Sequence, residues 1–304
     1  MPLFVIFVFG AWVLGAGTLL APAWPTLQPR IGLSAAFALA LVIGGAIFWA
    51  MLFVWDTLLI DYMVFFLISV VFLGGTLSYG QKRAEARGET LEDADQGWPG
   101  PFDLALLGAL ALLLILLVLF VPPPPIIEAL PPARGEITAV QPGFRALAAY
   151  LEHQLNQPMP QTQFAAGAVL AFLCSWLSYD LGAESKNKRW ARFALLSAVL
   201  YTAFLLNGQY DLLLGLAFAL AFVLYALRYA RAAHTVDALG AGLMLGAVLL
   251  AHLPLLALLV AAYVVGVIAL ALRRALQPRW LWAVLLLGVP LLALVAVSPW
   301  LLGR

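Results

Sequence analysis

Charged residues are scarce in this chain of 304 residues, and their scarcity excludes most soluble classes of protein. Only 10% of the residues are charged while 64% are apolar, whereas a soluble domain carries roughly 25% charged residues. The net charge is +1, so the chain lacks the basic surface that nucleic-acid binding needs. The single cysteine, Cys174, excludes a disulfide framework and predicts a thiol buried in a packed core.

Motifs of soluble enzyme chemistry are also missing. The three histidines, His153, His234 and His252, fall in separate segments and do not have metal-ligand spacing. The sequence has no glycine-rich phosphate loop, no serine-hydrolase or zinc-protease motif and no closely spaced cysteine pair. Soluble-type hydrolase, protease and redox functions therefore have no support.

What the sequence does contain is ten long apolar runs. A helix needs roughly 20 apolar residues to cross a bilayer, and these runs are continuous and rich in Leu, Ala and Val. They cover residues 3–21, 31–54, 57–79, 103–121, 163–182, 193–207, 211–227, 238–252, 254–272 and 281–301. The stretch from Ala238 to Leu272 would be about 52 Å long as one helix, so we expect His252-Leu253-Pro254 to divide it. The sequence predicts an all-α, polytopic membrane protein of about ten transmembrane helices.

The basic residues predict how these helices are oriented. If the runs alternate across the membrane, 13 of the 16 Lys and Arg residues fall on one side. They are Arg30, Lys82, Arg83, Arg87, Lys186, Lys188, Arg189, Arg192, Arg228, Arg231, Arg273, Arg274 and Arg279. Because short loops rich in Lys and Arg are retained in the cytoplasm, we expect this side to be cytoplasmic and the protein to lie in the plasma membrane with both termini outside. Asp180 and Glu184, at the cytoplasmic end of a span, are expected to form ion pairs at the interface.

Two long loops divide the chain into regions. We expect an N-terminal three-helix membrane segment at 1–79, a cytoplasmic connector at 80–102, and a seven-helix membrane region at 103–304 that contains the external loop 122–162. That loop begins with four prolines, which stiffen the chain. Its later part carries apolar residues at helical spacing from Phe144 to Leu155, which predicts a short amphipathic helix. This helix either lies along the outer membrane surface or packs at the start of the next span.

Carboxylates at the outer ends of the spans are the candidates for chemistry, because they can act as general base or metal ligand for a lipid-linked substrate. Glu128 and Glu136 lie in the proline-rich loop, where ordinary surface charge is the alternative explanation. Asp61 lies one turn inside the third span. Burying an ionisable group there costs free energy, which favours a functional role for it. His252 is a further candidate, and the alternative is an interfacial histidine beside the Pro254 turn.

Four segments carry a resemblance to a known family. They read QPGFRALAAYLEHQLNQP, LSYDLGAESKNKRWAR, NGQYDLLLGLAFALAFVLYALRYAR and GAGLMLGAVLLAHLPLLALL. From Gln141 to Trp300 the chain resembles the GT-C superfamily of membrane glycosyltransferases, in particular the dolichyl-phosphate-mannose or RgtA-like branch. In that family an external loop ends in a Pro-Gly-aromatic element and a short amphipathic helix, followed by a span that leads to a basic cytoplasmic turn.

The resemblance implies transfer of a sugar from a polyprenyl-phosphate donor on the outer membrane face. Members of the family usually carry an Asp or an Asp/Glu pair in the first large external loop. This loop has no Asp, so Glu128 and Glu136 are the residues that can activate the acceptor hydroxyl or hold a divalent metal. Two alternatives stay open: a non-enzymatic membrane subunit or scaffold, and a transporter. The expected partners are membrane lipid and the lipid-linked sugar, and the sequence identifies no protein partner.

Overall fold

The part of the chain that the structure describes is entirely helical. The computed structural model describes residues 100–124, 159–184, 188–232 and 235–272, together with Leu3, Ile6, Phe144 and six positions between 34 and 42. Its helices are α5 (Pro101–Phe120), α7 (Met159–Ala183), α8 (Lys188–Ala194), α9 (Ser197–Leu206), α10 (Tyr210–Ala232), α11 (Thr235–Ala251) and α12 (Leu253–Leu272). No strand occurs among these residues. The predicted all-α class is therefore confirmed for this part of the chain.

Four of the described helical segments are long and apolar enough to cross a membrane. They are Pro101–Phe120, Pro160–Ala183, Arg189–Leu206 and Tyr210–Arg231. Two shorter apolar helices, Asp237–Ala251 and Leu253–Ile268, follow them. These helices coincide with the predicted runs from 103–121 to 254–272, including the division at His252, while the total of ten spans stays a prediction.

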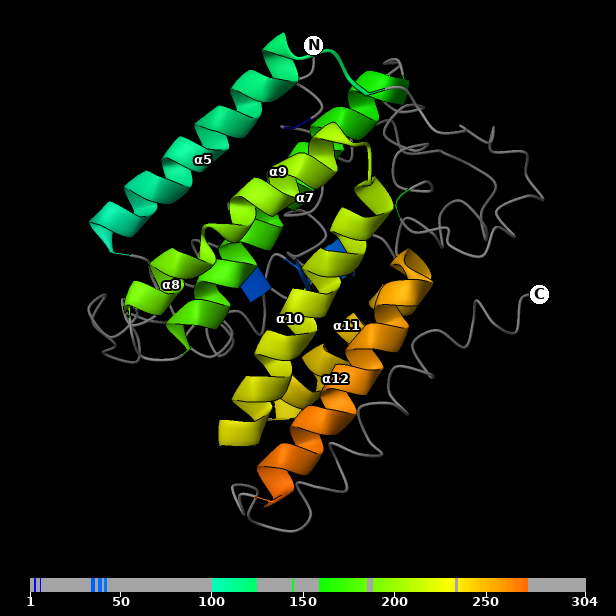
Figure 1. Ribbon diagram of the computed structural model, residues 1–304. Helices are drawn as coiled ribbons and strands as arrows, with labels where there is room; N and C mark the ends of the chain where they lie inside the picture. The colour runs from blue at the N-terminus through cyan, green and yellow to red at the C-terminus, as the bar shows by residue number, and fades with distance from the viewer. Residues whose placement is uncertain are drawn as a thin grey trace, which may run out of the picture.

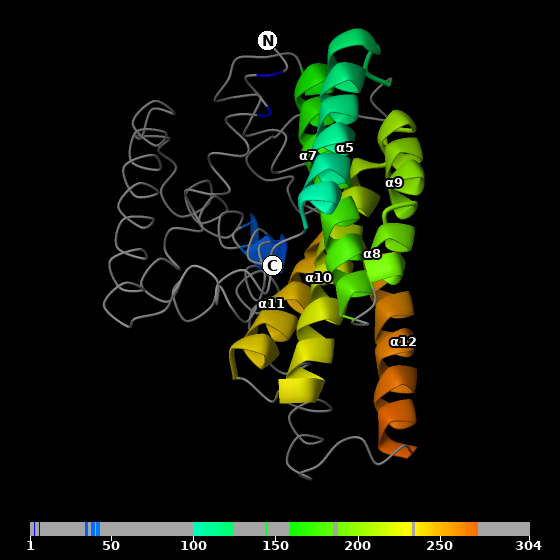
Figure 2. The ribbon, with the colours of Figure 1, turned by 90° about the vertical axis from the view of Figure 1, so that its left-hand side faces the viewer.

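Successive helices run in opposite directions, so the bundle has two distinct ends. Figures 1 and 2 show α5, α9 and α11 running one way and α7, α10 and α12 the other. The basic end is formed by α8, the starts of α5 and α11, and the ends of α7 and α10. All of the Lys and Arg residues that the structure describes lie there, on α8 and the last turns of α10: Lys188, Arg189, Arg192, Arg228 and Arg231. We call the other end, where α10 and α12 begin, the loop end.

The core of the bundle lies between α7, α10 and α11. Membrane helices gain little from hydrophobicity alone and associate through small residues that let their partners approach closely. Gly167 of α7 lies against the Tyr210 ring, and Gly240 of α11 lies against the Tyr225 ring. The thiol of Cys174 is fully buried in this core and contacts the Leu213 carbonyl at 3.4 Å. The predicted core thiol is therefore confirmed.

Helix α5 lies at the edge of the described bundle and packs against α7 (Figure 2). Its buried residues Asp103, Leu107, Leu114 and Val118 recur at intervals of four and seven residues, which places them on one stripe of the helix. Most of its other large side chains are exposed. In a protein of this composition the exposed leucines are suited to contact with lipid.

A bend separates α8 from α9. Here the Leu195 N–H donates to the Arg192 carbonyl at 3.1 Å and the Leu196 N–H to the Phe193 carbonyl at 3.0 Å. These are the tighter bonds of a 3₁₀ turn. The Ser197 hydroxyl also donates to the Ala194 carbonyl at 2.6 Å, a back-bond that commonly accompanies helix bending. The predicted span 193–207 is thus a helix that begins earlier and bends at its start.

Candidate functional site

A buried carboxylate connects α5, α7 and α8 at the basic end. The Asp103 side chain is 1% exposed and accepts hydrogen bonds from Arg192 Nε to Oδ1 at 2.7 Å and from the Tyr179 hydroxyl to Oδ2 at 3.0 Å. The Arg192 guanidinium also lies 4.7 Å from the centre of the Phe102 ring. Burying a carboxylate is costly unless it is paired and hydrogen-bonded, and both conditions are met here.

A second ion-pair cluster joins the end of α7 to α10. Glu184 accepts from Arg228 Nε at 2.8 Å and from Arg231 Nη1 at 2.6 Å. Arg231 Nη1 also donates to the Glu184 carbonyl at 3.0 Å. The expectation that Glu184 forms an ion pair is confirmed, and its partners come from α10, 44 and 47 residues along the chain.

Part of the predicted second span reaches the same end of the bundle. The Ser34 hydroxyl donates to Asp180 Oδ2, and the Tyr225 hydroxyl donates to the Ala35 carbonyl at 2.9 Å. Ser34 and Ala35 are both fully buried. These bonds attach the described positions near residue 35 to α7 and α10. Asp180, which we expected to form an ion pair, is held by a hydroxyl donor in this arrangement.

At the loop end, Pro124 and Phe144, from the segment predicted to form the external loop, lie against the described helices. Pro124, which follows α5, lies beside the α9–α10 turn, since a Cβ added to Gly208 would lie 3.6 Å from its Cγ. Gly208 has φ of 70°, a conformation that favours glycine. Phe144, from the middle of this loop, is buried and stacks on Tyr210 with ring centres 5.2 Å apart. Its burial favours packing against the bundle over a position along the membrane surface.

His252 has a structural role in this arrangement. It lies between α11 and α12, and its Nδ1 accepts a hydrogen bond from the Leu255 N–H at 3.1 Å. Such a bond satisfies one of the unpaired N–H groups at the start of α12. A Cβ added to Gly215 would lie only 2.8 Å from the His252 Cβ, so a side chain there would clash with His252. These are the contacts of a histidine in a turn beside Pro254, and the functional role of His252 stays a prediction.

The remaining predicted site residues, Glu128, Glu136 and Asp61, lie outside the residues that the structure describes. Within the described ranges, no group of three or more His, Cys, Asp or Glu side chains is placed to hold a metal ion. The predicted catalytic pair and the predicted divalent metal thus stay predictions.

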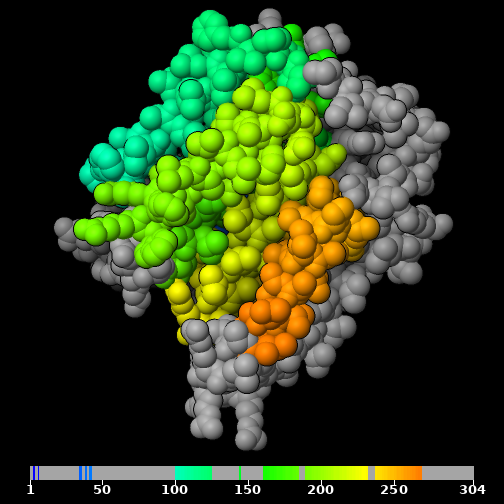
Figure 3. Space-filling model, viewed as in Figure 1, coloured from blue at the N-terminus to red at the C-terminus, as the bar shows by residue number. Residues whose placement is uncertain are grey.

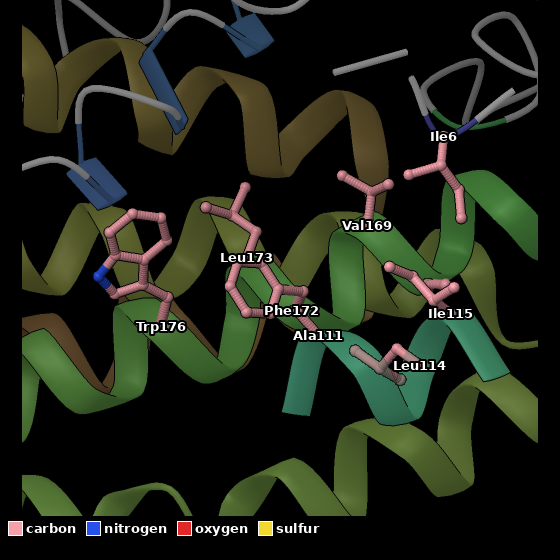
Figure 4. A pocket seen from close by; sticks show the side chains of 9 residues that line it. Ile6, Ala111, Leu114, Ile115, Val169, Phe172, Leu173 and Trp176 are labelled. Atoms are coloured by element: carbon pink, nitrogen blue, oxygen red, sulfur yellow. The ribbon is translucent and has the colours of Figure 1, made fainter. Parts of the chain in front are cut away.

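An apolar pocket lies between α5 and α7, the two described helices that flank the predicted external loop (Figure 4). Its volume is about 190 Å³, larger than the ~150 Å³ of an engineered cavity that takes up benzene. Its lining residues are Ile6, Ala111, Leu114, Ile115, Ala168, Val169, Phe172, Leu173 and Trp176. Apart from Ile6 they come from α5 and α7, and all are apolar, so the pocket is suited to a hydrocarbon chain and offers no polar chemistry of its own.

Asp103 and Arg192 were not predicted as interacting residues. The available signal was a carboxylate in the first turn of an otherwise uncharged run, PFDLALLGALALLLILLVLF. A charge at such a position requires a partner. The partner lies 89 residues further along the chain, however, and nothing in the local pattern selects Arg192 over the other basic residues near it.

Comparisons with known proteins give no further identification: no protein-family model, no curated protein and no solved structure matches this chain. The established description is that of a helical chain with four described segments long and apolar enough to cross a membrane.

Proposed function

We propose that this protein is a glycosyltransferase of the plasma membrane that uses a polyprenyl-phosphate sugar as donor at the loop end of the bundle. The observation that supports this proposal is the position of the apolar pocket. It lies between α5 and α7, and the segment that joins these two helices carries Glu128 and Glu136. A prenyl chain held in the pocket would extend along both helices, with its phosphate directed toward the loop end.

In this proposal the charged groups divide into two sets. The ion pairs of Asp103 and Glu184 hold the basic end together, and the basic loops keep that end in the cytoplasm. The loop end then faces outward. There one of the two loop glutamates takes the proton from the acceptor hydroxyl while the acceptor oxygen bonds to the anomeric carbon. The bond between that carbon and the phosphate oxygen breaks, and polyprenyl phosphate leaves.

The test is sugar transfer by the full-length protein in lipid nanodiscs supplied with a panel of polyprenyl-phosphate hexoses and pentoses. We expect Glu128→Gln together with Glu136→Gln to reduce transfer by about 10²–10⁴-fold, the usual contribution of a general base. Glu152→Gln, in the same loop and outside the proposed pair, serves as the matched control and should retain activity. Unchanged transfer in the double variant would sink the proposal.

A non-enzymatic membrane subunit is the second candidate, and the exposed apolar surface of α12 offers it a surface for a partner. Leu258, Val265 and Ile268 on this helix are exposed, Leu258 by 69%. These side chains contact either lipid or a second protein. Purification in a mild detergent separates the two functions: a partner retained in fixed stoichiometry, with no transfer from any donor of the panel, would favour the subunit.

A further inference from the structure

Helix α8 presents an aromatic surface at the basic end of the bundle. Trp190 and Phe193 are 59% and 63% exposed, and their rings meet edge to face with centres 6.0 Å apart. The side chains of α8 project outward at the left of the molecule in Figure 3. Exposed tryptophan at the end of a membrane helix is typical of the interface, where one side of the ring contacts hydrocarbon and the N–H contacts headgroups.

Arg192 lies on the same short helix and is held in a fixed orientation. Its Nε donates to the buried Asp103 carboxylate, and its Cζ lies over the Phe102 ring, 4.7 Å from the ring centre. The described hydrogen bond uses one of its five N–H donors, while the side chain remains 44% exposed. A guanidinium oriented in this way loses little entropy when its terminal N–H groups bind a second acceptor.

The two arginines of α10 at the basic end are arranged differently. Arg231 directs its Nη1 to both the carboxylate and the carbonyl of Glu184, and Arg228 Nε donates to the same carboxylate. Their described bonds join α10 to the end of α7. Arg192 combines a buried anchor with exposed aromatic residues on the same short helix, and this combination points to a ligand with both an anionic and an apolar part.

We propose that Arg192, Trp190 and Phe193 form a binding site for the phosphate headgroup of an anionic phospholipid, which we call the headgroup site. The Arg192 fork binds the phosphate oxygens by charge-assisted hydrogen bonds, while Trp190 and Phe193 contact the glycerol and upper acyl region. At this end the five described basic residues outnumber the four described carboxylates, Asp103, Asp180, Glu184 and Asp237, so the net charge of the described residues favours an anion. The headgroup site lies at the end opposite to the proposed sugar transfer, so each proposal can fail without the other.

The test measures lipid retained by the full-length protein in detergent, using native mass spectrometry with phosphatidylglycerol and phosphatidylcholine of identical acyl chains. We expect the wild-type protein to retain phosphatidylglycerol preferentially, and Arg192→Gln to weaken this retention by about tenfold, the loss of one charge-assisted bond. Because Arg192→Gln leaves Asp103 buried without its cation, the double variant Asp103→Asn with Arg192→Gln provides a second test with matched burial. It should lose the preference to the same extent.

Two further variants complete the test. Trp190→Leu with Phe193→Leu leaves the Asp103 pair intact and should weaken retention of both lipids. Arg231→Gln, which removes an exposed charge at the same end, is the matched control and should keep the preference. The proposal is overturned if the double variant of Asp103 and Arg192 retains phosphatidylglycerol as the wild type does, or if Arg231→Gln weakens this retention as much as Arg192→Gln. It is also overturned if inorganic phosphate displaces bound phosphatidylglycerol as strongly as added phosphatidylglycerol does.

Discussion

The variant Gly182→Ala is expected to lose about 1–3 kcal/mol of stability, the usual cost of overpacking. A Cβ at this position would lie 2.8 Å from both the Ala191 Cα and the Trp190 carbonyl oxygen. Both neighbours are backbone atoms of α8, so no side-chain rotation can relieve the clash. The α7–α8 hairpin would have to separate, and with it the contact that places Arg192 on Asp103.

Gly108→Ala in α5 is the matched control, because a Cβ there meets nothing within 4 Å. The same substitution inside a helix is intrinsically favourable by up to about 1 kcal/mol, so this variant should equal or exceed the wild type in stability. Thermal unfolding in detergent, followed by tryptophan fluorescence, measures both variants. Equal Tm values for Gly182→Ala and Gly108→Ala would contradict the close approach of α7 and α8.

Removal of the Arg192 side chain is the second change expected to have a large effect. Arg192→Ala leaves the carboxylate of Asp103, which is 1% exposed, with the Tyr179 hydroxyl as its one described donor. Breaking a fully buried pair costs about 3–5 kcal/mol, and because Arg192 is partly exposed we expect about 2 kcal/mol here. Thermal unfolding under the same conditions measures the loss.

Two further variants show whether this loss comes from the buried Asp103 carboxylate. Asp103→Asn combined with Arg192→Ala removes both charges and should recover more than half of the loss, since no buried ion remains unpaired. Arg231→Ala removes an arginine that is more exposed than Arg192 and leaves Glu184 paired with Arg228, so its cost should stay below about 1 kcal/mol. Equal losses of stability for Arg192→Ala and Arg231→Ala would show that the burial of Asp103 does not strengthen its ion pair.

Hydropathy alone predicted the helices well, because each described span is a long uninterrupted apolar run. The predicted runs 103–121 and 163–182 correspond to α5 and α7 within a few residues. The division at His252 was also predictable, since a single helix through Pro254 would be too long for one crossing. It would also miss one backbone hydrogen bond, because proline has no N–H.

The bend between α8 and α9 and the network around Asp103 were not predictable from the same signal. The bend contains neither proline nor glycine, and the bond from the Ser197 hydroxyl to the Ala194 carbonyl accompanies it. The network joins residues from three helices through tertiary contacts. Hydropathy reports how apolar a segment is, and it carries no information on which distant charge a buried carboxylate will meet.

The alternating helices connect the two proposals. If successive helices cross the membrane, the headgroup site on α8 and the loop that carries Glu128 and Glu136 must lie in opposite leaflets. Lipid binding at the basic end would then fix the orientation of the bundle, while sugar transfer would take place on the other side.

Labelling of single cysteines in intact cells tests this crossing most directly. In a Cys174→Ala background, one variant carries Gln209→Cys, an exposed position in the turn before α10, and another carries Ala183→Cys, an exposed position at the end of α7. A membrane-impermeant maleimide should label Gln209→Cys in intact cells and Ala183→Cys only after the membrane is opened. Labelling of both positions from the same side would contradict a bundle whose basic end and loop end lie on opposite faces of the membrane.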